Sequence, residues 1–306
     1  MQKFVSALRQ AWAPAWKTTV WLLKMMIPIS FATTLLQAYG VIDWMAQWLN
    51  PVFVGIGLPG SSAIAFLTGA FVNTYAGIAV MLTISLTVRE ATIIAVMTCL
   101  CHALFLEGAV FSKTGSSILK ITVLRCVMAF VAAFCLNLLL PEMHEPFMSS
   151  ASASTEESLL QVMTAWGVQT LRMSAMILLL IYALMAVQRL MENYGMLDSV
   201  SRLLTPLMVF FGLPRNAAYM WVAGNVLGVS YGSAVMIDLE ERGLISRDEA
   251  NTVNYHLSMN HSMLEDTCVF ASFGISAFWI LATRITFAFF VVWARKASMR
   301  LKAMLH

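Results

Sequence analysis

The chain carries the same residue pattern twice, and this internal repeat constrains its fold more than any other feature. Tyr39-Gly40 and Tyr194-Gly195 lie 155 positions apart, as do Gly57-Leu58-Pro59 and Gly212-Leu213-Pro214. After a four-residue insertion in the second half the spacing becomes 159 positions. Further pairs at these two spacings are Asp43 and Asp198, Gly69 and Gly224, Gly77 and Gly232, His102 and His261, Glu107 and Asp266, and Arg125 and Arg284. We therefore read the chain as a duplication of one structural unit.

Each half predicts the same elements in the same order. A long apolar helix comes first (residues 18–40 and 166–190), and a short amphipathic stretch suited to the membrane interface follows (41–55 and 197–210). Gly-Leu-Pro then opens an apolar segment of about 28 residues, which is too long for one upright crossing. Gly, Asn and Ser interrupt its centre, and broken backbone at membrane depth is tolerated only where it lines a cavity. We interpret it as a re-entrant helical hairpin, after which two further transmembrane helices complete the half.

The composition requires a membrane environment for so apolar a chain. Hydrophobic residues make up 59% of the sequence and charged residues only 11%, against about 25% charged in a soluble domain. These figures exclude a disordered chain, a nucleic-acid-binding protein and a typical cytosolic enzyme. The predicted fold class is an all-α polytopic membrane protein built from two repeats, in contact with the lipid bilayer.

The charges predict how the repeats are oriented. Three crossings in each half is an odd number, so the two repeats must have inverted topology. The linker at residues 141–160 contains no Lys or Arg, and we expect it to face outward because basic residues concentrate in cytoplasmic segments. Its acidic residues are Glu142, Glu145, Glu156 and Glu157.

This orientation divides the chain into five parts. Residues 1–17 and 298–306 are predicted cytoplasmic tails, and residues 18–140 and 161–297 are the two repeats. The expected location is the inner membrane, as a multi-pass protein with both termini in the cytoplasm. The first apolar run is too long for a cleavable signal peptide, so none is expected.

Ionisable residues inside membrane spans are energetically costly and usually functional. Those of the first half are His102 and Glu107, and those of the second are His256, His261, Glu265 and Asp266. His261 and Glu265 are four positions apart and should share one helix face, whereas His102 and Glu107, five apart, should not. Burial favours the neutral form of a carboxyl group, and His titrates near neutral pH. Glu265, Asp266 and His261 are therefore the candidate proton-coupling residues.

The hairpin breaks and the buried polar groups predict a substrate site. Half-helix ends at such breaks can hold polar or charged groups of a solute. The candidate substrate-binding residues are Asn73, Tyr75, Asn225, Ser230, Tyr231, His102, His261 and Glu107. An alternative is that the two histidines only satisfy backbone carbonyls and brace the broken helices. Since Leu106 is the counterpart of Glu265, the two halves are not chemically equal.

The two repeated arginines receive different predictions. Arg125 lies five residues after Lys120 and is expected to extend its side chain to the inner membrane surface. Arg284 lies near the middle of its span, where it could pair with an internal carboxylate or attract an anion, and pairing is the favoured alternative.

Two segments of the second half resemble a known family. Residues 224–236 (GNVLGVSYGSAVM) and 260–267 (NHSMLEDT) are similar to the nucleoside recognition, or Gate, domain of bacterial membrane proteins, which include the spore maturation proteins. Leu264–Thr267 also resembles a motif in the membrane part of ferrous iron transporter B, although the GTPase domain and pore cysteines of that family are missing here. The order of elements resembles the transport core of concentrative nucleoside transporters. The resemblance implies a membrane transport fold and leaves the solute open.

The leading hypothesis is a secondary transporter. It would move a small polar or anionic solute, nucleoside-like or another metabolite, by proton-coupled alternating access in which the hairpins gate or carry the solute. The first alternative is a divalent metal permease with ligands from His256, His261, Glu265 and Asp266, assisted by His102 and Cys101.

The second alternative is a non-transporting membrane accessory protein or enzyme. No nucleophile elbow, zinc-protease motif or phosphate-binding loop occurs in the sequence, so we predict no enzymatic activity. We also expect no cofactor and no nucleic-acid partner. The expected partners are the solute, the bilayer and further copies of the chain in a homo-oligomer.

Overall fold

The computed structural model describes residues 2–147 and 159–305, and helices dominate throughout these two ranges. The β pairing found within them is a single isolated bridge between Thr87 and Pro146. The predicted all-α class is therefore confirmed for the described residues. Glu156 and Glu157 of the predicted linker lie outside them.

The two halves contain corresponding helices in the same order. The first half comprises α1 (Gln2–Ala38), α2 (Val41–Val54), α3 (Ser62–Phe71), α4 (Thr74–Met81), α5 (Val88–Leu100), α6 (Leu104–Lys113) and α7 (Ile118–Leu139). The second half comprises α8 (Leu159–Asn193), α9 (Met196–Phe210), α10 (Ala218–Val226), α11 (Val229–Glu241), α12 (Arg247–Asn260), α13 (Met263–Ser272) and α14 (Ala277–Leu305). A short 3-10 turn, Arg215–Ala217, precedes α10.

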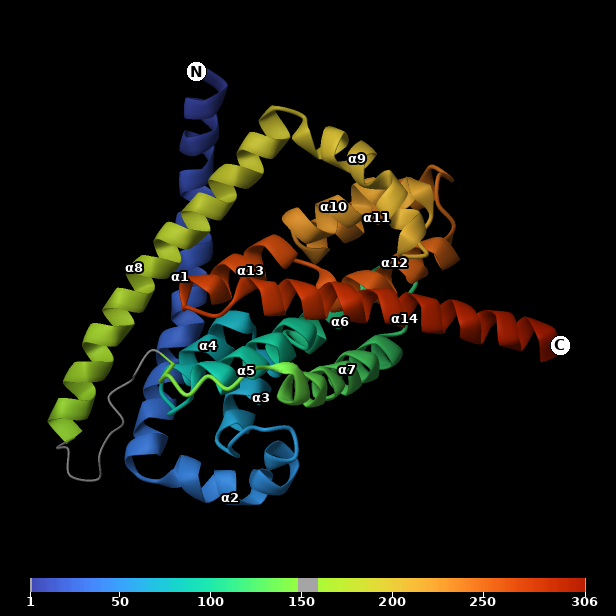
Figure 1. Ribbon diagram of the computed structural model, residues 1–306. Helices are drawn as coiled ribbons and strands as arrows, with labels where there is room; N and C mark the ends of the chain where they lie inside the picture. The colour runs from blue at the N-terminus through green and yellow to red at the C-terminus, as the bar shows by residue number, and fades with distance from the viewer. Residues whose placement is uncertain (1, 148–158, 306) are drawn as a thin grey trace.

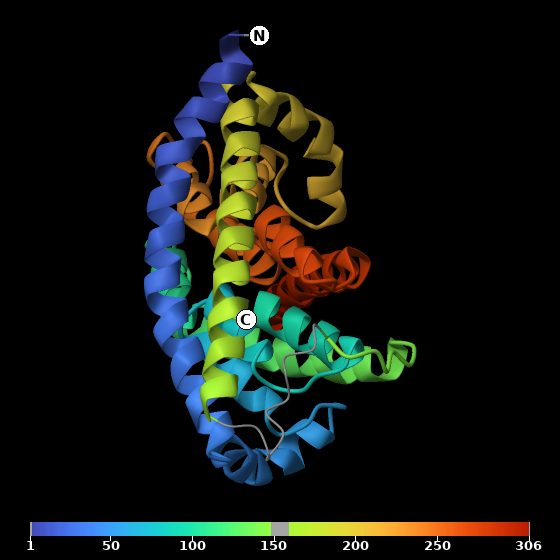
Figure 2. The ribbon, with the colours of Figure 1, turned by 90° about the vertical axis from the view of Figure 1, so that its left-hand side faces the viewer.

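Helices α1 and α8 pack side by side and run in opposite directions (Figures 1 and 2). Helix α2 follows α1 at one end of this pair, and α9 follows α8 at the other end. Gly40 and Gly195 adopt the left-handed conformation, with φ of 68° and 62°, where the chain turns into α2 and α9. Glycine is favoured at these turns because it has no Cβ. Residues 2–17, predicted as a tail, continue the first helix without interruption.

The segments predicted as hairpins are indeed two short helices each. Helices α3 and α4 meet at Val72–Asn73, where the Asn73 side chain accepts a hydrogen bond from the Ala76 N–H at 2.8 Å. A Cβ atom on Gly77 would lie 3.1 Å from the Cα of Gly69. In the second half, a Cβ on Gly232 would lie 2.8 Å from the Cα of Gly224. Both hairpins therefore require glycine where their two arms cross.

A second break interrupts the helix that follows each hairpin. Helix α5 is separated from α6 at Ala103, and α12 from α13 at Ser262, and both residues have positive φ (44° and 51°). The Ala103 N–H donates to the Gly69 carbonyl at 3.1 Å, and the Ser262 N–H donates to the Gly224 carbonyl at 3.0 Å. We predicted that His261 and Glu265 share a face of one continuous helix, and this is wrong because α12 ends at Asn260.

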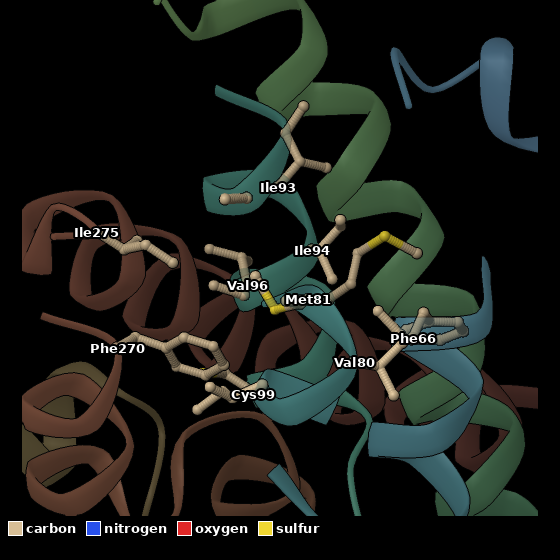
Figure 3. Packing of buried hydrophobic residues seen from close by; sticks show 14 of the residues in the cluster. Phe66, Val80, Met81, Ile93, Ile94, Val96, Cys99, Phe270 and Ile275 are labelled. Carbon is tan, nitrogen blue, oxygen red and sulfur yellow. The ribbon is translucent and has the colours of Figure 1, made fainter. Parts of the chain in front are cut away.

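The first hairpin is fixed against α5, whose residues from Ala91 to Leu100 are all buried. Figure 3 shows Phe66 of α3 and Val80 and Met81 of α4 packed beside Ile94 and Val96 of α5. The same cluster includes Phe270 of α13 and Ile275 from the loop that follows it. The core thus joins elements of both halves, and the site described below lies at this junction.

Among the described residues, five helical segments are long and apolar enough to cross a membrane. They are Lys3–Ala38, Val88–Lys113, Ile118–Leu139, Leu159–Asn193 and Ala277–Leu301. Their outward faces carry large apolar side chains such as Trp21, Val127, Leu179 and Phe290, as contact with lipid requires. We predicted six crossings. The counterpart of Val88–Lys113, formed by α12 and α13, does not qualify because polar residues such as Asn254, His256, Asn260 and His261 lower its mean hydropathy.

Candidate functional site

Three ionisable side chains meet where the broken helices of the two halves come together. His102 Nε2 lies 3.0 Å from Glu107 Oε1, and His261 Nε2 lies 3.0 Å from the same oxygen. The two Nε2 atoms are 3.3 Å apart. His102 follows α5, Glu107 lies in the first turn of α6, and His261 follows α12. The break at Ala103 is what brings His102 and Glu107 together despite their spacing of five.

The other nitrogen of each imidazole faces the backbone of its own half. His102 Nδ1 lies 3.0 Å from the Thr98 carbonyl oxygen, and His261 Nδ1 lies 2.7 Å from the Leu257 carbonyl oxygen. A carbonyl oxygen only accepts hydrogen bonds, so each Nδ1 must carry the proton. The bracing function considered for the histidines is therefore present, and their Nε2 atoms face Glu107 and each other.

Arg125 holds the second oxygen of Glu107. Its Nη1 forms an ion pair with Glu107 Oε2 at 2.7 Å, and its Nε donates to the Leu100 carbonyl at 2.9 Å. The side chain is 1% exposed. The prediction that Arg125 reaches the membrane surface is therefore wrong, because the buried carboxylate of Glu107 offers a stronger partner than the headgroup region.

The second half repeats this arrangement. Arg284 Nη1 pairs with Asp266 Oδ2 at 2.9 Å, which confirms the predicted pairing with an internal carboxylate. Its Nε donates to the Met259 carbonyl at 3.1 Å, and its Nη2 donates to the His261 carbonyl. Each half therefore has an arginine that neutralises a carboxylate and closes the end of a broken helix.

Glu265 distinguishes the second half from the first. Its Oε1 accepts a hydrogen bond from the Tyr75 hydroxyl at 2.9 Å. Tyr75 is the second residue of α4, next to the break of the first hairpin, and is 6% exposed. No ion pair to Glu265 is present among the described residues. The hairpin of one half is thus connected to the carboxylate of the other.

The remaining predicted site residues lie elsewhere. His256 accepts a hydrogen bond at Nδ1 from the Trp221 indole at 3.1 Å, and its ring lies tilted against that of Phe211, apart from the histidine pair. Asn225 is buried and donates to the Trp221 carbonyl at 2.9 Å. Tyr231 is exposed and lines an open groove with Asp238. The side chain of Ser230 lies outside the described part of the chain.

The sequence contains a spacing that predicts the partner of Arg125. Arg284 follows Asp266 by eighteen positions, and Arg125 follows Glu107 by the same number. Since Arg284 was expected to pair internally, the repeat alone predicts the same pairing for Arg125. The contact between Tyr75 and Glu265 had no such signal because neither residue has a like counterpart in the repeat.

Comparisons with known proteins place the chain in a family. A family model described as nucleoside recognition (Gate) matches residues 19–117, which run from α1 to the start of α7. The uncharacterized membrane protein YvoD of Bacillus subtilis (strain 168) is 33% identical over 283 residues, which cover 90% of this chain and 89% of that protein. The chain belongs to the nucleoside recognition (Gate) family.

The matched region of this Gate protein contains the first hairpin, His102 and Glu107. The segments quoted above for the resemblance lie in the second half, whereas the family model matches the first half. Both repeats therefore show similarity to the family. No solved structure matches it. The similarity to YvoD extends over both halves and marks the chain as a membrane protein.

Proposed function

We propose that this Gate protein is a secondary transporter that moves a small polar or anionic solute by alternating access. Two halves with corresponding elements, broken helices and buried charge at their junction are typical of such transporters. The opposite directions of α1 and α8 support an inverted relation between the halves, with α3–α4 and α10–α11 as re-entrant hairpins. The acidic linker then faces outward, and both termini lie on the cytoplasmic side of the inner membrane. We assign the chain no catalytic activity.

The hydrogen bond from Tyr75 to Glu265 is the observation that carries this function. It connects the tip of a hairpin to a carboxylate without a basic partner among the described residues. An ionised carboxylate accepts a hydrogen bond about twice as strong as a neutral one does. Protonation of Glu265 would therefore weaken the contact that holds the hairpin, and solute movement would be coupled to a proton.

Glu265 suits this function better than the other two proton-coupling candidates. Asp266 is neutralised by Arg284 at 2.9 Å, and His261 is held by the Leu257 carbonyl and by Glu107. The ionisable groups close enough to influence the charge on Glu265 are Tyr75, Asp266, His102 and Glu107.

A cavity beside the first hairpin is a candidate route for the solute. It has a volume of about 330 Å³ and lies between α8, the C-terminal end of α4 and the C-terminal end of α13. Gln169, Arg172 and Ser272 supply its polar lining. Arg172 forms no ion pair within the two described ranges, so its positive charge would favour an anionic solute. This charge supports the anionic alternative for the solute.

The test has two stages. A thermal-shift screen of nucleosides, carboxylates, amino acids and metal ions identifies the ligand, because binding to the folded state raises its melting temperature. Uptake of that ligand into proteoliposomes is then measured with and without a pH gradient for the wild type and for Glu265→Gln, which keeps the shape of the side chain.

We expect Glu265→Gln to exchange solute but to lose accumulation driven by the pH gradient. The matched control is Asp238→Asn, which removes an exposed carboxylate whose partner is Arg242, and which should behave like the wild type. Unchanged gradient-driven uptake by Glu265→Gln would contradict the coupling proposal.

A divalent metal permease is the second candidate function. The cluster of His102, Glu107 and His261 favours it, rather than the ligand set built around His256, because His256 lies apart from the other ionisable groups. Gradient-driven flux of a divalent ion in the same proteoliposomes distinguishes the two functions.

A further inference from the structure

Three side-chain atoms that can each bind a metal ion face one another at the junction of the two halves. His102 Nε2, His261 Nε2 and Glu107 Oε1 form a triangle with sides of 3.0, 3.0 and 3.3 Å. Both imidazoles are at least 95% buried and Glu107 is 7% exposed. This triangle is the one group of three or more His, Cys, Asp or Glu side chains in the described ranges with ligand atoms this close together.

If both imidazoles are neutral, neither Nε2 carries a hydrogen, and no hydrogen bond forms among the three atoms. Each Nδ1 donates its hydrogen to a backbone carbonyl, so each Nε2 presents a lone pair. The second oxygen of Glu107 pairs with the Arg125 guanidinium at 2.7 Å. Three acceptors so close together repel one another unless a positive species lies among them.

We propose that His102, His261 and Glu107 bind one divalent transition-metal ion. Ligand atoms about 2.1 Å from a metal, at tetrahedral or octahedral angles, are about 3.0–3.4 Å apart, which agrees with the triangle. Imidazole nitrogen combined with a carboxylate suits zinc, iron, nickel or copper better than magnesium or calcium.

The surroundings also resemble those of known metal ligands. A histidine that binds a metal almost always donates its other nitrogen to a carbonyl, a carboxylate or water, as both histidines do here to Thr98 and Leu257. Arg125 adds positive charge next to Glu107, which opposes the metal.

The ligands come from both halves, so the ion would connect them. His102 and Glu107 stand on either side of the break between α5 and α6, and His261 stands at the break between α12 and α13. The proposed ion would be resident and would join the two repeats at their breaks, so it differs from a transported solute and from the transported ion of the metal-permease alternative.

The experiment uses the full-length protein purified in detergent, stripped with a chelator and then dialysed against Co²⁺ or Zn²⁺. We expect one ion per chain by elemental analysis and visible absorption bands from bound Co²⁺. Glu107→Gln and His261→Ala should each weaken Zn²⁺ binding by more than about tenfold, since even residues that only orient a ligand contribute that much. The control is His144→Gln, which changes an exposed histidine of the loop after α7 and should leave binding unchanged.

His102→Cys distinguishes the loss of a metal ligand from misfolding as the cause of weaker binding. A thiolate is also a metal ligand, so this variant should keep one ion and gain a sulfur-to-cobalt charge-transfer band. Absence of metal from the stripped and reloaded wild type would overturn the proposal and indicate a shared proton in the triangle. Equal binding by Glu107→Gln and the wild type would overturn it as well. Glu265→Gln should retain the ion, so failure of the metal site and failure of proton coupling give different results.

Discussion

His102 and His261 hold equivalent positions in the two repeats, and their Nε2 atoms lie 3.3 Å apart. Each imidazole is fixed by a carbonyl of its own half, at Thr98 and Leu257, which are themselves equivalent. The contact therefore joins equivalent sequence positions of the two halves. Glu107 of the first half joins both rings, whereas its counterpart Asp266 is engaged by Arg284.

The buried pair of Arg284 and Asp266 should contribute strongly to folding. Arg284→Met leaves the Asp266 carboxylate buried without its partner, and breaking such a pair destabilises a protein by about 3–5 kcal/mol. Unfolding in mixed detergent micelles measures the loss. The double variant Arg284→Met/Asp266→Leu should recover part of it, because no unpaired charge remains. A single variant as stable as the wild type would contradict this account.

The crossing of the hairpin arms should not tolerate a side chain. Gly232→Ala places a Cβ 2.8 Å from the Cα of Gly224, and the resulting overpacking should destabilise the protein by about 1–3 kcal/mol. Gly77→Ala should behave similarly, since its Cβ would lie 3.1 Å from the Cα of Gly69. Gly167→Ala in α8 is the control, because no atom lies within 4 Å of the added Cβ. There alanine should stabilise by about 0.5–1 kcal/mol. Thermal unfolding compares the three variants, and equal effects at all positions would refute the close crossing.

The break after α5 should accept glycine and reject branched residues. Ala103 has φ of 44°, a region that glycine occupies freely and that is strongly unfavourable for a β-branched side chain. Ala103→Gly should fold with near wild-type stability, and Ala103→Val should lose at least about 1 kcal/mol. The melting temperatures of the two purified variants test this difference. A valine variant as stable as the glycine variant would mean that the helix does not break at this residue.

The hydroxyl of Tyr75 should restrain the tip of the first hairpin. Tyr75→Phe removes a hydrogen bond to a carboxylate, worth about 1.5–3 kcal/mol, so amides in the first turn of α4 should exchange with solvent about tenfold faster or more. Hydrogen exchange followed by mass spectrometry measures the change. Tyr39→Phe, at an exposed tyrosine before α2, should not alter exchange in α4. Unchanged protection in Tyr75→Phe would show that the contact does not hold the hairpin.

The repeat predicted the order of elements and the buried polar residues, because matching residues at a constant spacing fix which segments correspond. It did not predict the breaks at Ala103 and Ser262. Neither residue is a glycine or a proline, so the local sequence shows no interruption, and the break depends on a hydrogen bond to the distant carbonyl of Gly69 or Gly224. Because of these breaks, His102 lies beside Glu107, and Glu265 does not share a continuous helix with His261. Arg125 was predicted at the membrane surface because it lies close to Lys120 in the sequence. Its equivalence to Arg284 instead indicates an internal partner.

The difference between Glu265 and Leu106 has a consequence for the energetics of the proposed cycle. If both repeats were chemically identical, exchanging their conformations would give two states of equal free energy, one open to each side of the membrane. A carboxylate in one repeat and a leucine in the other removes this degeneracy. Protonation of Glu265 would then shift the conformational equilibrium of the proposed cycle, so the pH on one side of the bilayer would influence which side the empty protein faces.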